Sequence, residues 1–175
     1  MARHKRGPPE HGARSELFSV NSLVYAMIAP DDPALATLIA HHAAHSAAHY
    51  PGESNHNQDG NALAAIGAVM FAGRLGPTGA VVAMGGYKLI GPDAAEVNSM
   101  HVTEAARRQG AGAHILTLIL DHARRAGARQ IWLETGSLPA SSAARRLYAR
   151  AGFVTCPPFG EYQPDPMSIF MTRTL

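Results

Sequence analysis

The sequence is poor in cysteine, in charge and in long apolar runs. Cys156 is the single cysteine of the chain, so an internal disulfide is impossible, and no Cys-x-x-Cys motif surrounds it. No apolar stretch reaches the length of a membrane span, and the N-terminal charges are not followed by the apolar segment of a signal peptide. We therefore expect a cytoplasmic protein with no membrane partner and no redox chemistry.

The composition predicts a globular domain rather than a disordered chain. Hydrophobic residues make up 46% and charged residues 16% of the 175 residues, which provides enough apolar material for a substantial core. The formal net charge is only +2 and the basic residues are scattered, so we expect no nucleic-acid partner. Residues 1–15 contain almost nothing apolar, so we expect a mobile tail there, followed by a single domain over residues 16–175.

The most informative stretch is the turn at residues 107–113, Arg-Arg-Gln-Gly-Ala-Gly-Ala, between an alternating strand pattern and a helical pattern. Glycines at positions 110 and 112 allow positive φ and leave no Cβ in the way of a ligand, so several amides can point outward at the helix start. Together with the two arginines, these amides predict an anion site, which suits a diphosphate. The alternative is that the glycines merely allow a tight turn. The spacing fits neither common glycine-rich nucleotide motif.

The remaining patterns predict further strands and helices. We expect strands over residues 23–28, 65–75, 80–89, 95–102, 130–135, 153–155 and 168–172, and helices over 34–48, 110–126 and from Ser141 to Gly152. Aspartates before the first helix and serines at 141 and 142 are typical N-cap residues, and residues 53–60 have the composition of a loop. This order predicts a mixed α/β (α+β) fold with a central sheet.

The first predicted helix is rich in histidine. His41, His45 and His49 follow one another at intervals of four residues and therefore share a helix face. Such a face can bind zinc, but a site needs further matched ligands, and the protease pattern His-Glu-x-x-His is missing. We expect a solvated or partly packed histidine face and no metal. A metal-binding histidine protein remains the alternative.

Two segments resemble motifs of the GNAT superfamily of N-acetyltransferases. The Arg-x-x-Gly-x-Gly at residues 107–112 resembles the family's acyl-CoA signature, Gln/Arg-x-x-Gly-x-Gly/Ala. Residues 141–153 resemble its later motif, Asn-x-x-Ala-x-x-x-Tyr-x-x-x-Gly-Phe, with Ser141 standing where Asn is common. The resemblance implies a GNAT-like mixed sheet of about seven strands flanked by helices, with the central strands splayed apart.

The resemblance also implies acetyl-CoA as co-substrate. Main-chain groups of the strand before the turn would bind the pantetheine amides as an added strand does, and the Ser141 hydroxyl would replace part of an asparagine contact. The cofactor-binding residues implied in this way are Met100, Val102, Arg107, Arg108, Gln109, Gly110, Ala111, Gly112, Ala113, Ser141 and Ala144.

Acetyl transfer to an amine needs a base and a proton donor. Tyr148 matches the family's tyrosine and would protonate the departing thiolate; the alternative is a core tyrosine on an amphipathic helix. Glu96 is our candidate base, because it lies eleven positions before Arg107, as the catalytic glutamate does in some family members. Strand alternation would place Glu96, Asn98, Met100 and Val102 on one face. The alternatives for Glu96 are an ordinary strand glutamate or an anchor for the acceptor's ammonium.

These residues imply an N-acetyltransferase that acts by direct attack in a ternary complex. We expect a primary amine as acceptor, a small amine or amino acid more than a protein. Glu134, Glu161, Tyr162 and a segment including His49, Tyr50 and His56 are candidates for the acceptor pocket. A non-catalytic acyl-CoA-binding sensor of the same fold is the alternative, and a homodimer is possible for the superfamily.

Overall fold

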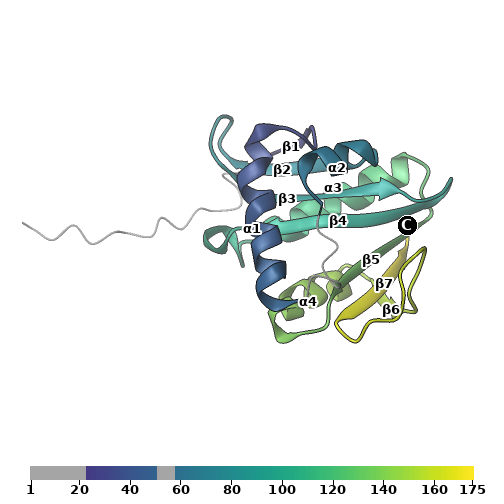
Figure 1. Cartoon of the computed structure of the whole chain (residues 1–175). Helices are drawn as coiled ribbons and strands as arrows, with labels where there is room; N and C mark the ends of the chain where they lie inside the picture. Colours follow the sequence, from purple (N-terminus) through teal and green to yellow (C-terminus); the bar gives the residue numbers. More distant parts are fainter. Residues whose placement is uncertain (1–22, 51–57) are drawn as a thin grey trace, which may run out of the picture.

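The computed structural model describes residues 23–50 and 58–175, which form a mixed sheet with helices on both faces (Figure 1). The sheet has seven strands in the order β1-β2-β3-β4-β5-β7-β6. The strands are β1 Leu23–Ile28, β2 Val69–Leu75, β3 Val81–Leu89, β4 Ala94–Val102, β5 Gln130–Gly136, β6 Val154–Cys156 and β7 Ser168–Thr174. The predicted fold class is thus confirmed, whereas the predicted tail at residues 1–15 and His56 lie outside the described residues.

The first four strands form an antiparallel meander, and β4 then pairs with β5 in parallel. This parallel pairing covers only three positions, ending where Glu96 lies opposite Trp132. β5 continues in register with β7 as far as Gly136, so β5 stays with its other neighbour while β4 departs from it (Figure 1). The predicted splay between the central strands is confirmed, and it opens the sheet at its centre.

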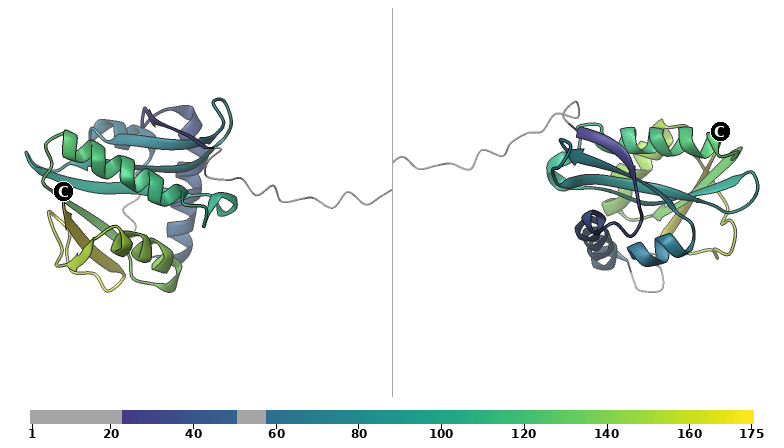
Figure 2. Two further views of the ribbon diagram at one scale, coloured as in Figure 1. Left: turned by 180° about the vertical axis from the view of Figure 1, so that it is seen from behind. Right: turned by 90° about the horizontal axis from the view of Figure 1, so that it is seen from above.

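The helices cover the two faces of the sheet (Figure 2). They are α1 Pro33–His49, α2 Gly60–Ala65, α3 Ala111–Arg125 and α4 Ser142–Arg150, with two short 3-10 turns, η3 Glu104–Ala106 and η4 Pro139–Ser141. α3 packs on one face, where Ile115, Leu116 and Ile119 are buried in the larger hydrophobic cluster. α1 and α2 pack on the other face, where Leu35 and Leu63 join a smaller cluster. No helix in residues 23–50 or 58–175 is long and apolar enough to cross a membrane.

Two predicted boundaries were wrong. Residues 60–65 form α2, where the sequence suggested a loop running into a strand; Asp59 caps this short helix by accepting from the Ala62 amide at 2.8 Å, and β2 begins only at Val69. Ser141 occupies the N-cap position of α4, but its side chain makes no cap bond there. The expected cap at Asp32 is present, because its carboxylate accepts from the Ala34 amide at 2.8 Å.

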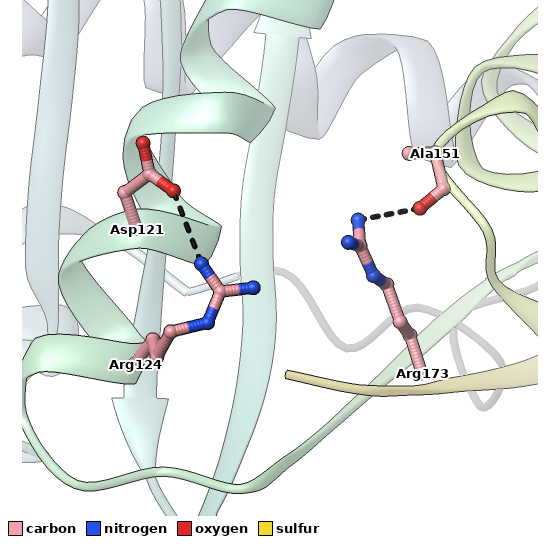
Figure 3. A network of polar contacts seen from close by, with 4 residues as sticks. All are labelled: Asp121, Arg124, Ala151 and Arg173. Atoms are coloured by element: carbon pink, nitrogen blue, oxygen red, sulfur yellow. Dashed lines mark hydrogen bonds and ion pairs between the residues drawn. The ribbon is translucent and has the colours of Figure 1, made fainter.

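The end of α4 is tied to the last strand of the sheet. Arg173 of β7 donates a hydrogen bond of 2.6 Å to the carbonyl of Ala151, the C-cap residue of α4 (Figure 3). The last carbonyls of a helix have no partner within the helix, so a guanidinium there satisfies one of them and suits the helix dipole. An exposed pair on α3, Arg124 with Asp121 at 3.4 Å (Figure 3), contributes little by comparison. The position of α4 on the sheet is therefore fixed at its C-terminal end.

A β-bulge in β4 changes which side chains share a face. Ser99 has a φ of 54°, and Ser99 and Met100 together oppose Gly85 of β3. Because one extra residue reverses the alternation, Glu96 and Asn98 face α1 and α2, while Met100 turns toward α3: a Cβ on Gly85 would lie 2.3 Å from its sulfur. The prediction that Glu96, Asn98, Met100 and Val102 share one face was therefore wrong.

Candidate active site

The opening between β4 and β5 leads into a large cleft of about 2410 Å³. Its walls come from β4, the turn before α3, the end of β5, α4, the β6–β7 connection and the last turns of α1. Every residue that the sequence suggested for catalysis or cofactor binding lines this cleft: Glu96, Met100, Val102, Arg107, Arg108, Gln109, Gly110, Ala111, Gly112, Ala113, Ser141, Ala144 and Tyr148. The fold thus brings together two motifs that are about thirty residues apart in the sequence.

At one end of the cleft the turn presents the start of α3. Gly110 is the N-cap residue with φ 86°, and no side chain caps the helix. The second residue in the left-handed region is Arg108, with φ 59°, rather than Gly112. Of the two glycines that allow positive φ, only Gly110 adopts it, because α3 begins at Ala111 and Gly112 already has helical backbone. The amides of the first helical turn need partners, and this end of the cleft offers them to a ligand.

Side chains hold the turn in this shape. Arg107 donates from Nε to the carbonyl of Val102 at 3.1 Å, and Gln109 donates from Nε2 to the carbonyl of Ala105 at 2.9 Å. Burial, and to a lesser degree neighbouring histidines and the guanidinium of Arg107, lower the pKa of His45 and of His101. Uncapped amides, a helix dipole and adjacent arginines are the donor set that binds phosphate groups. The residues present at this end therefore fit a diphosphate.

Tyr148 lies deeper in the cleft, on α4. It is only 6% exposed, and its ring packs edge-on against Phe153 with 5.8 Å between centroids. Burial, and to a lesser degree the charge of Glu134, raise the pKa of Tyr148 above its ordinary value. The phenol therefore keeps its proton at neutral pH and can act as a hydrogen-bond or proton donor.

Glu96 lies on the opposite wall and is held by two partners. It is 6% exposed; its Oε2 lies 3.1 Å from the ammonium of Lys88, and its Oε1 accepts from the hydroxyl of Tyr162 at 2.7 Å. Burial, the bond to Glu96 and the charges of Glu96 and Glu134 raise the pKa of Tyr162, so that hydroxyl remains a donor. Neither Lys88 nor this pairing was foreseen from the sequence, because the partners come from three separate elements.

Aromatic rings and a second carboxylate complete the end of the cleft that holds Glu96. Phe159, Tyr162 and Phe170 contact one another with centroid distances from 5.0 to 6.0 Å. Glu134 of β5 accepts from the hydroxyl of Ser168 at 2.6 Å. This end of the cleft therefore combines a mostly apolar wall with the buried carboxylate of Glu96 and the partly buried carboxylate of Glu134.

Asn98 is a polar side chain without a partner in the cleft floor. Both atoms of its amide are buried, and within the described part of the chain neither has a hydrogen-bond partner. Leaving a buried polar group unpaired costs about 1–3 kcal/mol, so an amide in this position is a candidate for contact with a ligand or water. Its place two residues from Glu96 on the same face was predicted, but nothing in the sequence indicated that it would lack a partner.

The histidines of α1 are distributed differently from the predicted face. His42, which the pattern left out, faces the sheet and contacts His101 of β4 with 5.5 Å between ring centroids, while His45 and His49 stack at 4.8 Å. Burial lowers the pKa of both His42 and His101 to about 4, with smaller effects from neighbouring cations. No group of three or more metal-ligating side chains in the described ranges could hold a metal ion. His42 and His101 therefore form a neutral wall of the cleft, and His101 lies near Arg107.

Comparisons with known proteins agree with this geometry. A model of the acetyltransferase (GNAT) family matches residues 34–153. The chain is 39% identical over 132 residues to the IAA acetyltransferase of Azospirillum brasilense, which covers 72% of this chain and 80% of that protein. It is also 39% identical over 80 residues to uncharacterized N-acetyltransferase YsnE of Bacillus subtilis, covering 46% of this chain and only 53% of YsnE, about half of that relative's length.

Solved structures share the fold. A crystal structure from Klebsiella pneumoniae, described as an acyl-CoA N-acyltransferase, has a TM-score of 0.71 and 28% identity over 87% of this chain and 97% of its own. YncA of Salmonella typhimurium, solved with its cofactor acetyl-CoA, has a TM-score of 0.64 over 88% of this chain and 94% of its own. At 20% identity, the second likeness bears on the fold alone.

Proposed function

Because this chain belongs to the acetyltransferase (GNAT) family, with acetyl-CoA as acyl donor, we propose that its acceptor is a primary amine. A small amine or amino acid fits better than a protein, and the amine attacks directly within a ternary complex. One observation carries the proposal: a single cleft has an uncapped helix N-terminus at one end and the buried groups Tyr148 and Glu96 at the other.

Tyr148 supplies the proton for the departing sulfur. Bound acetyl-CoA provides a thioester carbonyl that an amine can attack. The phenol of Tyr148 is protonated at neutral pH because burial raises its pKa, and it lies in the same cleft as the turn that fits the diphosphate. Its role is to donate that proton as the carbon–sulfur bond breaks.

Glu96 receives the proton that the acceptor nitrogen loses, directly or through a water molecule. A carboxylate offers about four acceptor positions; Lys88 and Tyr162 occupy two, so positions remain for the amine. Lys88 and Tyr162 keep the carboxylate in place, as a general base must be positioned within reach of its proton. Asn98, on the same face of β4, is placed to contact the acceptor.

Burial of the acceptor end supports a small acceptor. Glu96 is nearly inaccessible, and the rings of Phe159, Tyr162 and Phe170 form one wall. The carboxylates and aromatic rings at this end of the cleft suit an acceptor that carries a compact ammonium group on an apolar chain. Because one relative is named for IAA, IAA belongs among the compounds to be tested beside amines.

The test is a panel of primary amines, amino acids and IAA incubated with acetyl-CoA, followed by detection of the released thiol and by mass spectrometry of the products. We expect at least one primary amine to raise thiol release well above hydrolysis and to gain an acetyl group on nitrogen. Tertiary amines of similar size serve as controls, because they cannot form a stable amide. Acetylation confined to a lysine-containing peptide would contradict the preference for a small acceptor.

One observation favours a second candidate, a non-catalytic acyl-CoA sensor. Both oxygens of Glu96 already have partners, Lys88 and Tyr162, as in a purely structural network. Under this alternative, calorimetry would detect acetyl-CoA binding while no acceptor raised thiol release. The amine panel therefore separates the two functions.

A further inference from the structure

Lys88 is the ion-pair partner of Glu96 and lies nearer to the opening of the cleft. The antiparallel register places Lys88 of β3 opposite Glu96 of β4, and the Lys88 ammonium lies 3.1 Å from Oε2 of Glu96. The side chain of Lys88 is 27% exposed, against 8% for that of Glu96, and both residues line the cleft. An ammonium has three N–H donors, and Glu96 accepts from one of them. Lys88 therefore has donors left for a ligand that enters the cleft.

Apolar side chains accompany Lys88 along the same part of the cleft. Leu89 and Ile90 follow it in the chain, and Ile66, the C-cap residue of α2, precedes β2, which pairs with β3. Ile66, Leu89 and Ile90 are exposed by 38%, 48% and 40%, although they are large and apolar, and all three line the cleft. We call them the apolar rim. Exposed apolar residues gathered beside a charged group at a cleft are typical of a ligand site.

The charges at this end restrict what can bind there. Glu96 and Glu134 repel a ligand that is only anionic, and Lys88 repels one that is only cationic. An α-amino acid has both charges, and its nitrogen and carboxylate oxygens are about 3 Å apart because one Cα joins them. This separation matches the 3.1 Å between the Lys88 ammonium and the Glu96 carboxylate. The ion pair is therefore complementary to the zwitterion of an α-amino acid.

We propose that the acceptor is an α-amino acid with an apolar side chain and that Lys88 binds its carboxylate, an inference that rests on the proposed function. The α-nitrogen lies at Glu96, deeper in the cleft, the carboxylate lies at Lys88, and the side chain packs against the apolar rim. After the ammonium has released a proton to water, the nitrogen forms the amide bond as the carbon–sulfur bond of acetyl-CoA breaks. One proton passes from nitrogen to Glu96, and Tyr148 gives one to sulfur; exchange with water restores both groups.

A carboxylate anchor has an effect that a merely structural role does not have. If Lys88 only held Glu96 in place, its removal would slow the acetylation of every acceptor by the same factor. An anchor adds a loss that is confined to acceptors with a carboxylate next to the amine. The ratio of kcat/KM between two matched acceptors therefore isolates the anchor, because any disturbance of Glu96 cancels in the ratio.

The experiment measures kcat/KM for three acceptors. They are leucine, its decarboxylated amine 3-methylbutylamine, and 6-aminohexanoate, an isomer of leucine whose carboxylate is far from its amine. We expect leucine to exceed the other two by about 10- to 100-fold, the effect of hydrogen bonds between charged groups. Lys88→Met should lower the ratio of leucine to 3-methylbutylamine by the same factor, whereas Lys88→Arg, which keeps the positive charge, should retain most of it.

A second pair of acceptors and a control variant complete the design. Phenylalanine and 2-phenylethylamine repeat the comparison with a larger apolar side chain and should give the same change in ratio. Arg125→Met also removes one cation, but at an exposed residue of α3 that does not line the cleft, and should leave both ratios unchanged. If Lys88→Met does not fold, the preference of the unaltered protein between leucine and its isomer decides the question.

The outcomes separate the inference from the function on which it rests. Equal kcat/KM values for leucine, its isomer and its amine would overturn the inference, as would an unchanged ratio in Lys88→Met. Turnover of other amines of the panel but of neither leucine nor phenylalanine would overturn it as well and leave the proposed function standing. If no amine raised thiol release while acetyl-CoA still bound, the proposed function would fail first. A preference for the amino acid that Lys88→Met removes supports the anchor.

Discussion

The two ends of the cleft differ in the chemical groups that form them. The diphosphate end consists of main-chain amides on one short turn, with arginines beside them, and the side chains of Arg107 and Gln109 brace that turn. The acceptor end consists of side chains from β3, β4, β5, β7 and the β6–β7 connection, joined by hydrogen bonds and an ion pair. A site made of backbone depends on local conformation, whereas a site made of side chains depends on the whole fold.

The ends also differ in charge. Arg107 and Arg108 belong to the diphosphate end, while Glu96 and Glu134 belong to the acceptor end with Lys88 as the cation paired with Glu96. The histidines between α1 and β4 lie beside Arg107 without adding to its charge at neutral pH, because burial lowers their pKa values. The cleft is therefore suited to a ligand with an anionic end and to a partner that carries a cation.

The largest effect should come from Tyr148→Phe, because this hydroxyl is the proposed proton donor to the departing sulfur. Loss of a general acid lowers kcat by about 10²- to 10³-fold. The affinity for coenzyme A should stay within about twofold, since the diphosphate end is untouched, and the melting temperature should change little because the ring still packs on Phe153. Steady-state kinetics measure kcat, calorimetry measures the affinity for coenzyme A, and thermal unfolding measures the melting temperature. Unchanged turnover would remove Tyr148 from the mechanism.

The next largest effect should be on the stability of the protein at acidic pH, through the buried His42. His42 has a pKa of about 4 when folded, against an ordinary value of 6.5, so the unfolded chain binds more protons between these values. The free energy of unfolding should therefore fall as the pH drops from about 6.5 to 4, by at most about 3 kcal/mol from His42. His45 and His101 lie against His42, and the half-buried His101, which also faces His41 and Arg107, should contribute less.

Urea unfolding at several pH values, compared between two variants, measures this contribution. His42→Gln should flatten the dependence between pH 6.5 and 4, while His41→Gln, on the exposed side of the same helix, should leave it as in the unaltered protein. If the free energy of unfolding depended on pH in the same way in both variants, burial against β4 would not keep His42 neutral. Carboxylate titration at low pH affects both variants alike and cancels in the comparison.

A backbone substitution tests whether the diphosphate end depends on conformation. Gly110→Ala places a Cβ at φ 86°, which costs about 1–2 kcal/mol and should also shift the amides, raising the dissociation constant for coenzyme A about tenfold. Gly67→Ala is the matched control, because Gly67 has φ 68°, a Cβ there would meet nothing within 4 Å, and it does not line the cleft. Both variants should lose stability, but only Gly110→Ala should lose affinity. Equal affinities would show that the turn does not bind the cofactor.

The smallest effect should come from Tyr162→Phe at the acceptor end. The variant removes the hydrogen bond to Glu96 but keeps the ring beside Phe159 and Phe170. One lost hydrogen bond in this network should raise the KM for the acceptor about 2- to 5-fold and leave the KM for acetyl-CoA unchanged. An equal rise in both constants would mean that the two ends are not separable.

This contrast also explains what could be predicted from the sequence. The turn at residues 107–113 and the helix carrying Tyr148 are contiguous motifs, so their local structure could be predicted from the chain, as could the seven strands, while the splay was implied by the family resemblance. The pairing of Glu96 with Lys88 and Tyr162 could not be predicted, because it depends on the register of β3 and β4 and on the path of the β6–β7 connection. The hydrogen bond between the hydroxyls of Tyr50 and Ser141 joins residues 91 positions apart, and no local pattern signals it.

Some errors had local causes. α2 is only six residues long, too short to produce a periodic pattern, so the sequence indicated no helix between the predicted loop, which ended at residue 60, and the predicted strand, which began at residue 65. His42 was left out of the helix face because the spacing of four residues selected His41 instead. Glycine allows a positive φ at position 112, but the second residue with a positive φ is Arg108, where the residue type gives no warning.

The extra residue at Ser99 has a consequence for how β4 can change over time. Upstream of it, substitutions alter the end of the cleft that we propose for the acceptor. Downstream, they alter the wall that we expect the donor to follow. Shortening the strand there by one residue would exchange the surroundings of Met100 and His101, placing a thioether among the imidazoles and an imidazole in the main core. The length of this strand is therefore more tightly constrained than its composition, and the proposed acceptor end can diversify by point substitution while the donor's wall stays constant.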